Sequence, residues 1–263
     1  LAMSCRAMWV ARIASTPPAH DTLIAADEPL TTWELVIFAC SPNVGPLPAA
    51  RVEATTINNM LDGQHDTGPT ERPWRGRVHV HRTDDDIVCG TPAHLMNYLE
   101  NQTPRRLHFI GHARGAGGRR TLGFTDADGN LLTPNAGAIV NRLRAGVARG
   151  LWLVVLNACE TEVLGGRLHR EAGVPFVVCW RTRTVDCAAR KFGTEFHDVC
   201  AQPRGSRSKL EHYRKAFDEA VHKILSEWAY PRDMNGNEIQ RGEKVHKYEL
   251  RGPRPDELDP TVI

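Results

Sequence analysis

Residues Leu151–Leu156 read Leu-Trp-Leu-Val-Val-Leu, and Asn157-Ala158-Cys159-Glu160-Thr161 follows them directly. A run that is apolar throughout, rather than at alternate positions, is typical of a strand covered by helices on both faces. Its length suits a strand and is too short for a buried helix. The stretch therefore predicts a central strand of a parallel sheet with a polar turn at its carboxyl end.

Shorter apolar runs recur on both sides of this strand, with helical patterns between them. We expect further strands at 35–40, 78–81, 106–110 and 175–180, and a hairpin at 121–132. We expect helices at 48–61, 91–99, 134–147, 161–171, 186–199 and 210–225. Thr91 is expected to cap the second of these helices, and Gly173 to stop the fourth. Strands alternating with helices predict the α/β class, with a mostly parallel sheet flanked by helices on both faces.

The same pattern predicts one domain over residues 33–227. Residues 1–32 hold Arg6 and Arg12 but no long apolar run before Asp21, and we expect a disordered or remnant N-terminal segment there. Residues 228–263 are polar and rich in Pro and Gly, and are expected to form a C-terminal tail with room for one extra hairpin.

The composition is that of an ordinary globular protein. The chain has 263 residues, of which 41% are hydrophobic, and 33 Lys+Arg against 31 Asp+Glu leave a net charge of +2. That balance excludes collagen-like and wholly disordered chains and argues against a dedicated nucleic-acid binder. No apolar run reaches the roughly 18–20 residues that span a bilayer, so no membrane partner is expected.

The seven cysteines lack a CxxC pair and regular spacing. That pattern makes a poor disulfide framework and predicts a reducing compartment, taken as the cytoplasm. It also argues against a zinc site built from cysteines. We expect Cys40, Cys179, Cys187 and Cys200 to be core thiols. His79 and His81 share one strand face and could bind a metal, but no third ligand lies near them in the sequence. We therefore predict neither a metal nor a cofactor.

Two predicted strand ends carry reactive side chains. In open α/β sheets, sites form beyond the carboxyl ends of the strands. His112 follows the strand at 106–110 within a glycine-rich stretch, and Cys159 comes at the start of a predicted helix. A helix N-terminus lowers a cysteine pKa and presents N–H groups that can hold an oxyanion. The pattern indicates a thiolate nucleophile at Cys159, with His112 as its acid and base.

Other residues at this sheet edge are candidates for substrate binding. Gly111 and Gly115 would let the loop backbone approach a substrate closely. Trp180 ends a strand at the same edge and is either a core residue or a wall of the substrate pocket. Asp186 is first of all a helix cap and second a candidate substrate contact. Gly115–Gly118 lacks the GxGxxG spacing and the lysine that nucleotide-binding loops need.

Four stretches in chain order resemble the CHAT domain. They are Leu107-His108-Phe109-Ile110-Gly111-His112, the hairpin 122–132, Leu153-Val154-Val155-Leu156-Asn157-Ala158-Cys159-Glu160-Thr161, and 173–180 with Asp186, Ala189 and Phe192 behind it. The resemblance covers about residues 35–226. CHAT domains are grouped with caspase-like cysteine peptidases, separases and metacaspases. The resemblance implies a caspase-like sheet, a His112–Cys159 dyad, and hydrolysis of peptide bonds in a protein or peptide substrate.

Two positions depart from the pattern of the wider group. Ala113 stands where caspase-like enzymes usually place a Gly whose N–H helps to bind the oxyanion. Asn157 stands where metacaspases carry an Asp that receives a basic substrate side chain, so a preference for Arg or Lys does not follow. Glu160, Glu162 and Asp186 could supply acid, while Arg181 and Arg183 argue the other way, which leaves the specificity open.

Three function classes remain open from the sequence, of which a nucleotide-binding α/β protein that uses Gly115–Gly118 is the least favoured. The first is a cysteine endopeptidase. The second is a catalytically silent CHAT-like interaction module in signalling or regulated cell death. In either case, possible partners include a regulatory protein or a helical-repeat domain missing from this chain, because CHAT domains often follow helical repeats.

Overall fold

The computed structural model describes residues 33–62, 78–81, 90–102, 104–115, 120–181, 186–228 and 260–263. The predicted N-terminal segment 1–32 and residues 229–259 of the predicted tail lie outside these ranges.

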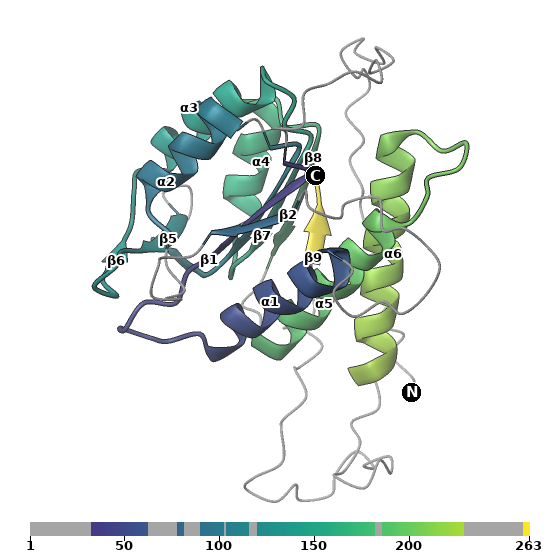
Figure 1. Cartoon of the computed structure of the whole chain (residues 1–263), viewed down its shortest axis with the longest axis horizontal. Helices are drawn as coiled ribbons and strands as arrows, with labels where there is room; N and C mark the ends of the chain where they lie inside the picture. Colours follow the sequence, from purple (N-terminus) through teal and green to yellow (C-terminus); the bar gives the residue numbers. More distant parts are fainter. Residues whose placement is uncertain are drawn as a thin grey trace, which may run out of the picture.

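A six-stranded sheet forms the centre of the described structure (Figure 1). Its order is β2 (Val78–His81), β1 (Leu35–Ala39), β3 (Arg106–Ile110), β7 (Leu153–Asn157), β8 (Phe176–Trp180) and β9 (Pro260–Val262). The first five strands run parallel, and β9 pairs antiparallel with β8. Every residue of β1, β7 and β8 is buried, as expected for strands with helices on both faces. The predicted fold class is confirmed.

Helices cover the two faces of the sheet in two separate groups (Figure 1). One face carries α1 (Pro48–Asp62), α5 (Asp186–Ala201) and α6 (Lys209–Trp228). The other face carries α2 (Pro92–Asn97) with the π-helical turn η1 (Tyr98–Gln102), α3 (Ala136–Val147) and α4 (Glu162–Arg170).

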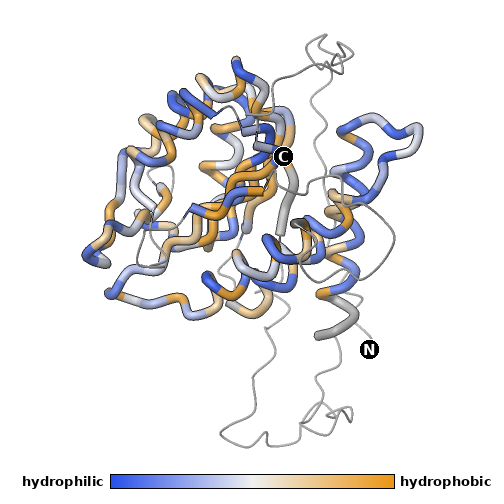
Figure 2. The backbone as a smooth tube through the Cα atoms, viewed as in Figure 1, coloured by the Kyte–Doolittle hydropathy of each residue, from blue (hydrophilic) through white to orange (hydrophobic). Residues whose placement is uncertain are grey.

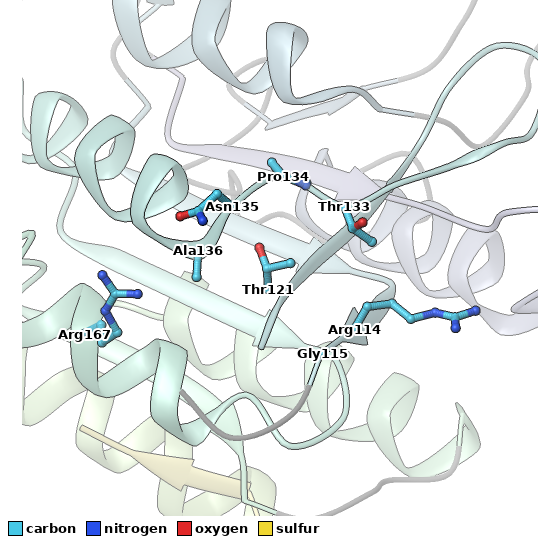
Figure 3. Close-up of a pocket in the computed structure, with 8 residues that line it drawn as sticks. All are labelled: Arg114, Gly115, Thr121, Thr133, Pro134, Asn135, Ala136 and Arg167. Carbon is cyan, nitrogen blue, oxygen red and sulfur yellow. The ribbon is translucent and has the colours of Figure 1, made fainter. Parts of the chain in front are cut away.

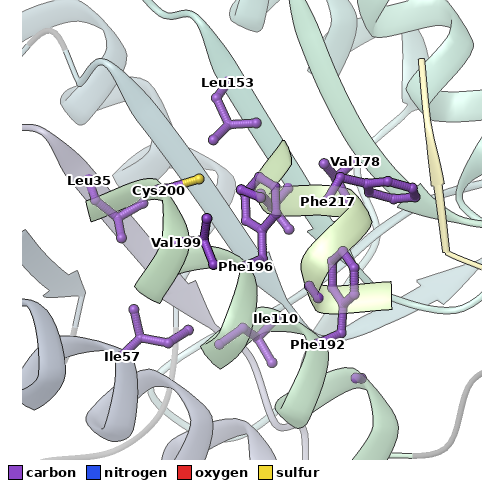
Figure 4. Packing of buried hydrophobic residues seen from close by; sticks show 14 of the residues in the cluster. Leu35, Ile57, Ile110, Leu153, Val178, Phe192, Phe196, Val199, Cys200 and Phe217 are labelled. Atoms are coloured by element: carbon purple, nitrogen blue, oxygen red, sulfur yellow. The ribbon is translucent and has the colours of Figure 1, made fainter. Parts of the chain in front are cut away.

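The sheet divides the apolar core into two clusters, because side chains of a strand alternate between faces. Leu153 and Val155 of β7 join the cluster under α1, α5 and α6, and Val154 and Leu156 join the other. Figure 2 shows the apolar residues gathered along the sheet and on the helix faces that touch it. Figure 4 shows the first cluster, where aromatic rings of α5 and α6 pack on the strands.

Local signals set several helix ends. Thr91 caps α2 as predicted: its hydroxyl accepts from the His94 N–H, and the His94 side chain reaches back to the Thr91 N–H. Asn135 caps α3 by accepting from the Gly137 N–H at 2.7 Å. Gly173, predicted to stop α4, has a φ of 78° that suits glycine.

A small antiparallel sheet lies beside the main one. It consists of β4 (His112–Arg114), β5 (Thr121–Thr125) and β6 (Leu131–Leu132). The hairpin of β5 and β6 was predicted, whereas residues 112–114 were expected to lie in a loop and instead pair with β5. His112 thus begins a strand, and its backbone is held opposite Gly123.

The end of the chain also differs from the expectation. Pro260–Val262, placed in a polar tail by the sequence, forms the edge strand β9. Ile263 continues the pairing, since its N–H donates to the Val177 carbonyl at 2.9 Å. The sheet therefore takes its last strand from outside the predicted domain bounds of 33–227.

Candidate active site

The ends of β3 and β7 bring His112 and Cys159 to the same edge of the sheet. The two strands are parallel neighbours, and Ile110 pairs with Asn157 at their carboxyl ends. His112 and Cys159 each come two residues after this pair, on strands that lie about 4.8 Å apart. Both residues are partly exposed. The residues predicted to form the dyad therefore leave adjacent strand ends, in matching positions.

A backbone carbonyl orients His112. Its Nε2 lies 2.5 Å from the carbonyl oxygen of Gly45, in the loop between β1 and α1. A carbonyl can only accept, so Nε2 carries the proton in this contact, and in the neutral ring Nδ1 keeps its lone pair. The ring is thereby held in the tautomer whose Nδ1 can take up a proton.

The loop that presents this carbonyl is itself fixed. Gly45 has a φ of 85°, a conformation that favours glycine, and a Cβ there would lie 3.4 Å from His112 Nε2. The Leu47 N–H donates to the Ser41 hydroxyl at 2.8 Å, closing the loop. The Asn43 N–H donates to the Gly129 carbonyl at 2.8 Å and ties the loop to the β5–β6 turn.

Cys159 lies in a tight turn between β7 and α4. The residue after it, Glu160, has a φ of 49°, unusual for a residue with a side chain. Thr161 is fully buried: its hydroxyl donates to the Ala158 carbonyl at 2.9 Å and accepts from the Trp180 N–H at 3.2 Å. The helix begins at Glu162, one residue later than expected, so Cys159 precedes its first turn rather than forming part of it.

The three candidates around His112 have different surroundings. Gly111 is buried, its N–H donates to the Asn157 carbonyl at 3.3 Å, and a Cβ there would lie 2.9 Å from the Phe109 ring. Its small size therefore serves packing, not the approach of a substrate. Ala113 is half-buried and packs against the core, while Gly115 is exposed with a φ of 99°.

Asn157 and Trp180 lie in the interior. Their relative exposures are 3% and 1%, and Trp180 Nε1 donates to Asn157 Oδ1 at 2.6 Å. Asn157 Nδ2 donates to Glu53 Oε1 at 2.6 Å and to the Ala189 carbonyl at 2.8 Å. Of the two readings of Trp180, the structure favours the core residue, and the Asn157 side chain has internal partners in place of a substrate.

The charged candidates near the turn have partners of their own. Glu160 forms an ion pair with Arg120, and Glu162 forms one with Arg181 at 3.3 Å. Asp186 is the first residue of α5, and its side chain lies outside the described residues, as does Arg183.

The sequence analysis missed Gly45 and Glu53. Glu53 of α1 is 1% exposed, and its Oε1 lies 3.0 Å from Nε2 of His108, which is fully buried. A buried carboxylate is unusual unless it is paired and hydrogen-bonded. The apolar residues Val52, Ile57 and Leu61 revealed a helix here, but nothing in the local sequence shows which polar residue of it points inward.

A cavity of about 450 Å³ lies next to β4, between the small sheet and helices α3 and α4 (Figure 3). Its lining residues are Arg114, Gly115, Thr121, Thr133, Pro134, Asn135, Ala136 and Arg167. Gly115 is the predicted site residue among them, and neither His112 nor Cys159 contributes. The cavity therefore reaches the end of β4, the strand that begins with His112, and does not contain the predicted dyad.

A sequence profile of the CHAT domain matches residues 5–230. This chain belongs to the CHAT domain family. The match starts well before residue 33, the predicted domain boundary. A search of curated proteins finds no match to this CHAT domain.

Among solved structures, this CHAT domain is similar to a complex of the Porphyromonas gingivalis RgpB pro- and mature domains. The identity is 8%, the TM-score is 0.43, and the match covers 75% of this chain and 43% of the other.

Three of the other four described thiols of the CHAT domain are less exposed than Cys159. Cys40, Cys179 and Cys200 are buried, as predicted, whereas Cys187, also expected in the core, is half-buried like Cys159. Burial raises the pKa of the Cys200 thiol to about 12, which keeps it protonated and unreactive. None of the five described cysteines forms a disulfide.

Two further searches covered only the described part of the CHAT domain. Within it, no group of three or more His, Cys, Asp or Glu side chains could hold a metal ion. His81 is one of the two histidines considered for a metal. Its Nε2 instead lies 2.9 Å from Nδ1 of His94. No described helix combines the length and apolar character that crossing a membrane requires.

Proposed function

We propose that this CHAT domain is a cysteine endopeptidase with Cys159 as nucleophile and His112 as its acid and base. One observation carries the proposal: the Gly45 carbonyl accepts a hydrogen bond from Nε2 of His112 and so orients its ring. His112 follows β3, and Cys159 follows the neighbouring parallel strand β7. A histidine that only filled space at a sheet edge would not require a glycine with positive φ to present a carbonyl to it.

The first half of the reaction forms an acyl-enzyme. Nδ1 of His112 takes the proton from the Cys159 thiol, and the thiolate attacks the carbonyl carbon of the scissile peptide bond. The carbon–sulfur bond forms, and the carbon–nitrogen bond breaks. The proton on Nδ1 passes to the departing amine, and Nε2 stays bonded to Gly45 throughout.

The second half regenerates the enzyme. His112 accepts a proton at Nδ1 from a water molecule, whose oxygen attacks the thioester carbon. The carbon–sulfur bond breaks, the acid product leaves, and the thiolate again faces the protonated histidine. The reaction consumes one water and requires no oxidant, metal or cofactor.

The oxyanion would be held by backbone N–H groups near the nucleophile. The Cys159 N–H, in the turn before α4, is the first candidate. Ala113 and Gly115 are the candidates on the strand of His112. Gly111 is not, because its N–H already donates to the Asn157 carbonyl.

The proposed substrate is a protein or peptide of open sequence preference. Glu160 and Glu162 are already paired with arginines, so neither is an uncompensated acid that would favour a basic substrate residue. A regulatory protein or a helical-repeat domain as partner, and a cytoplasmic location, belong to the same proposal.

Labelling with a thiol-directed peptide electrophile tests the proposal. The full chain is labelled, digested and analysed by mass spectrometry, with Cys159→Ala, His112→Ala and Cys187→Ala as variants. We expect Cys159 to react fastest, and His112→Ala to remove that preference. Cys187, half-buried and on α5, is the matched control: its replacement should leave the labelling of Cys159 unchanged.

Equal labelling of Cys159 and Cys187, unaffected by His112→Ala, would contradict an active dyad. That outcome would favour the silent interaction module, whose binding function would survive modification of Cys159.

A further inference from the structure

We propose that Glu53 is a positioning residue for the Cys159 turn, an inference that rests on the proposed peptidase function. Glu53 lies on α1, across the interior from the turn. It acts through Asn157, the last residue of β7, and does not contact the reacting atoms.

Five buried side chains form one hydrogen-bonded chain that converges on this carboxylate. Their relative exposures are 0–3%, and they are His197, His108, Glu53, Asn157 and Trp180. His197 Nε2 lies 2.8 Å from His108 Nδ1, and His108 Nε2 lies 3.0 Å from Glu53 Oε1. From the other side, Trp180 Nε1 donates to Asn157 Oδ1, and Asn157 Nδ2 donates to Glu53 Oε1.

The directions of these bonds follow from the chemistry of the groups. Burial, together with His108 and Arg106, holds the pKa of His197 well below its usual value, so its ring is neutral. With its proton on Nε2, it donates to His108, and the unpartnered atom is Nδ1, an acceptor. His108 Nε2 then donates to Glu53. The Glu53 carboxylate is therefore the acceptor at which both arms end.

The chain fixes the strand end from which Cys159 emerges. The Asn157 amide contacts three elements at once: Glu53 on α1, Trp180 on β8 and the Ala189 carbonyl on α5. Trp180 also bonds to Thr161, just after the turn, through its backbone N–H. Hydrogen bonds thus hold Asn157 before Cys159 and Thr161 after it. The bond between Glu53 and Asn157 is the contribution of α1 to this arrangement.

The helix facing Glu53 leaves room for the carboxylate. Gly193 lies in the middle of α5, where glycine is a much poorer helix former than alanine. A Cβ at this position would lie 2.2 Å from Glu53 Oε1 and 3.1 Å from His108 Cε1. The glycine is therefore explained by the space that the Glu53–His108 pair occupies.

The same segment of chain also serves His112. The loop that presents the Gly45 carbonyl leads directly into α1, which carries Glu53. One continuous segment, from the end of β1 into α1, thus contacts His112 directly and reaches the strand that leads to Cys159 through Asn157.

The test measures how fast iodoacetamide alkylates Cys159 relative to Cys187 in the full chain, by mass spectrometry. We expect Glu53→Leu, which removes the acceptor, to lower this ratio by roughly 10-fold or more, since small displacements of catalytic groups have effects of that size. Glu53→Gln keeps an acceptor oxygen and is expected to stay within about 3-fold of wild type. If Glu53→Gln keeps the Cys159/Cys187 ratio and Glu53→Leu does not, the ratio depends on the hydrogen-bond acceptor at position 53 and not on its negative charge.

Two controls accompany these variants. Glu34→Gln weakens the Arg106–Glu34 ion pair, whose side chains are each 12% exposed, at the opposite end of the strands. It should lower stability and leave the Cys159/Cys187 ratio unchanged. Cys200 is buried and becomes labelled only on unfolding, so its labelling reports the folded fraction of every variant.

Gly193→Ala displaces the Glu53 carboxylate without removing it. This variant tests the positioning role of Glu53 if Glu53→Leu does not fold. We expect a reduced ratio with Cys200 protected. The inference is overturned if no variant at positions 53 or 193 lowers the ratio while Cys200 stays protected. A wild-type chain that shows no preference for Cys159 would instead overturn the peptidase function, which is a separate outcome.

Discussion

The carbonyl oxygen of Gly45 and Nε2 of His112 lie 2.5 Å apart, although the two residues are separated by 67 positions in the chain. This contact assigns the proton on the ring and fixes the direction in which the ring points. It also explains why position 45 is a glycine, since the loop needs a φ of 85° to present the carbonyl.

Gly45→Ala is the first prediction that follows. The new methyl group would lie 3.4 Å from His112 Nε2, in a backbone conformation that costs about 1–2 kcal/mol for a residue with Cβ. We expect the loop to shift and His112 to lose its anchor, lowering the rate of peptide hydrolysis roughly 10- to 100-fold. Steady-state kinetics on a cleavable peptide would measure the loss.

Gly173→Ala is the matched control for that variant. Its φ of 78° is similar, and the nearest atom to its Cβ is Val147 Cγ1 at 3.9 Å, an ordinary contact. It should lower stability by a similar amount and leave the rate unchanged. Equal rate losses in both variants would show that backbone strain, rather than the contact with His112, is responsible.

Trp180→Phe gives a second prediction, on stability. The substitution keeps an aromatic ring but removes the bond to Asn157 Oδ1, leaving a buried acceptor without its donor. We expect the free energy of unfolding to fall by about 1–3 kcal/mol, the usual range for an unsatisfied buried group. Urea denaturation followed by circular dichroism would measure it.

Trp152→Phe provides the comparison. Trp152 precedes β7 at the other end of the strand, and its ring lies 4.4 Å from the Lys209 ammonium in a cation–π contact. Such a contact is worth about 0.5–1 kcal/mol at an exposed site, so the loss should be smaller. A larger loss here than at Trp180 would contradict the importance of the bond to Asn157.

The sequence was informative wherever the signal is local. The apolar run of β7 predicted a buried strand, and the strand ends predicted where His112 and Cys159 would lie, because parallel neighbours end at one edge of a sheet. The cap at Thr91 and the glycine stop at Gly173 are short-range patterns as well.

The contacts that support the site were not predictable in the same way. Asn157 and Glu53 lie 104 positions apart, and only the tertiary packing of α1, which contacts β1, β2 and α5, brings them together. The short strands β4 and β9 were missed for another reason. They have three residues each, too few to show a periodicity. β9 also begins with Pro260, which is tolerated because it lies at the sheet edge.

Gly193→Ala carries a third prediction, on stability rather than labelling. Alanine is the better helix former by about 1 kcal/mol, so a gain would be expected on propensity alone. We expect a net loss instead, because the methyl group would lie 2.2 Å from Glu53 Oε1. Thermal unfolding would measure the change.

Gly166→Ala in α4 is the control for helix propensity. Its Cβ would meet the guanidinium of Arg170 at 3.0 Å, the far end of a flexible side chain that can move. We expect a stability equal to or above that of wild type. If both glycine variants gain stability, Gly193 is not there to make room for the carboxylate.

Stability at acidic pH gives the last prediction. Burial, with His94 and His79 nearby, lowers the pKa of His81 from 6.5 to about 4. The unfolded chain therefore binds a proton below pH 6.5 that the folded chain does not bind until about pH 4. The contribution of His81 is fully present above pH 6.5 and is lost as the pH falls through this window. His81→Asn should show a shallower decrease of the urea midpoint than wild type between these two pH values, and parallel curves would show that His81 is not the group responsible.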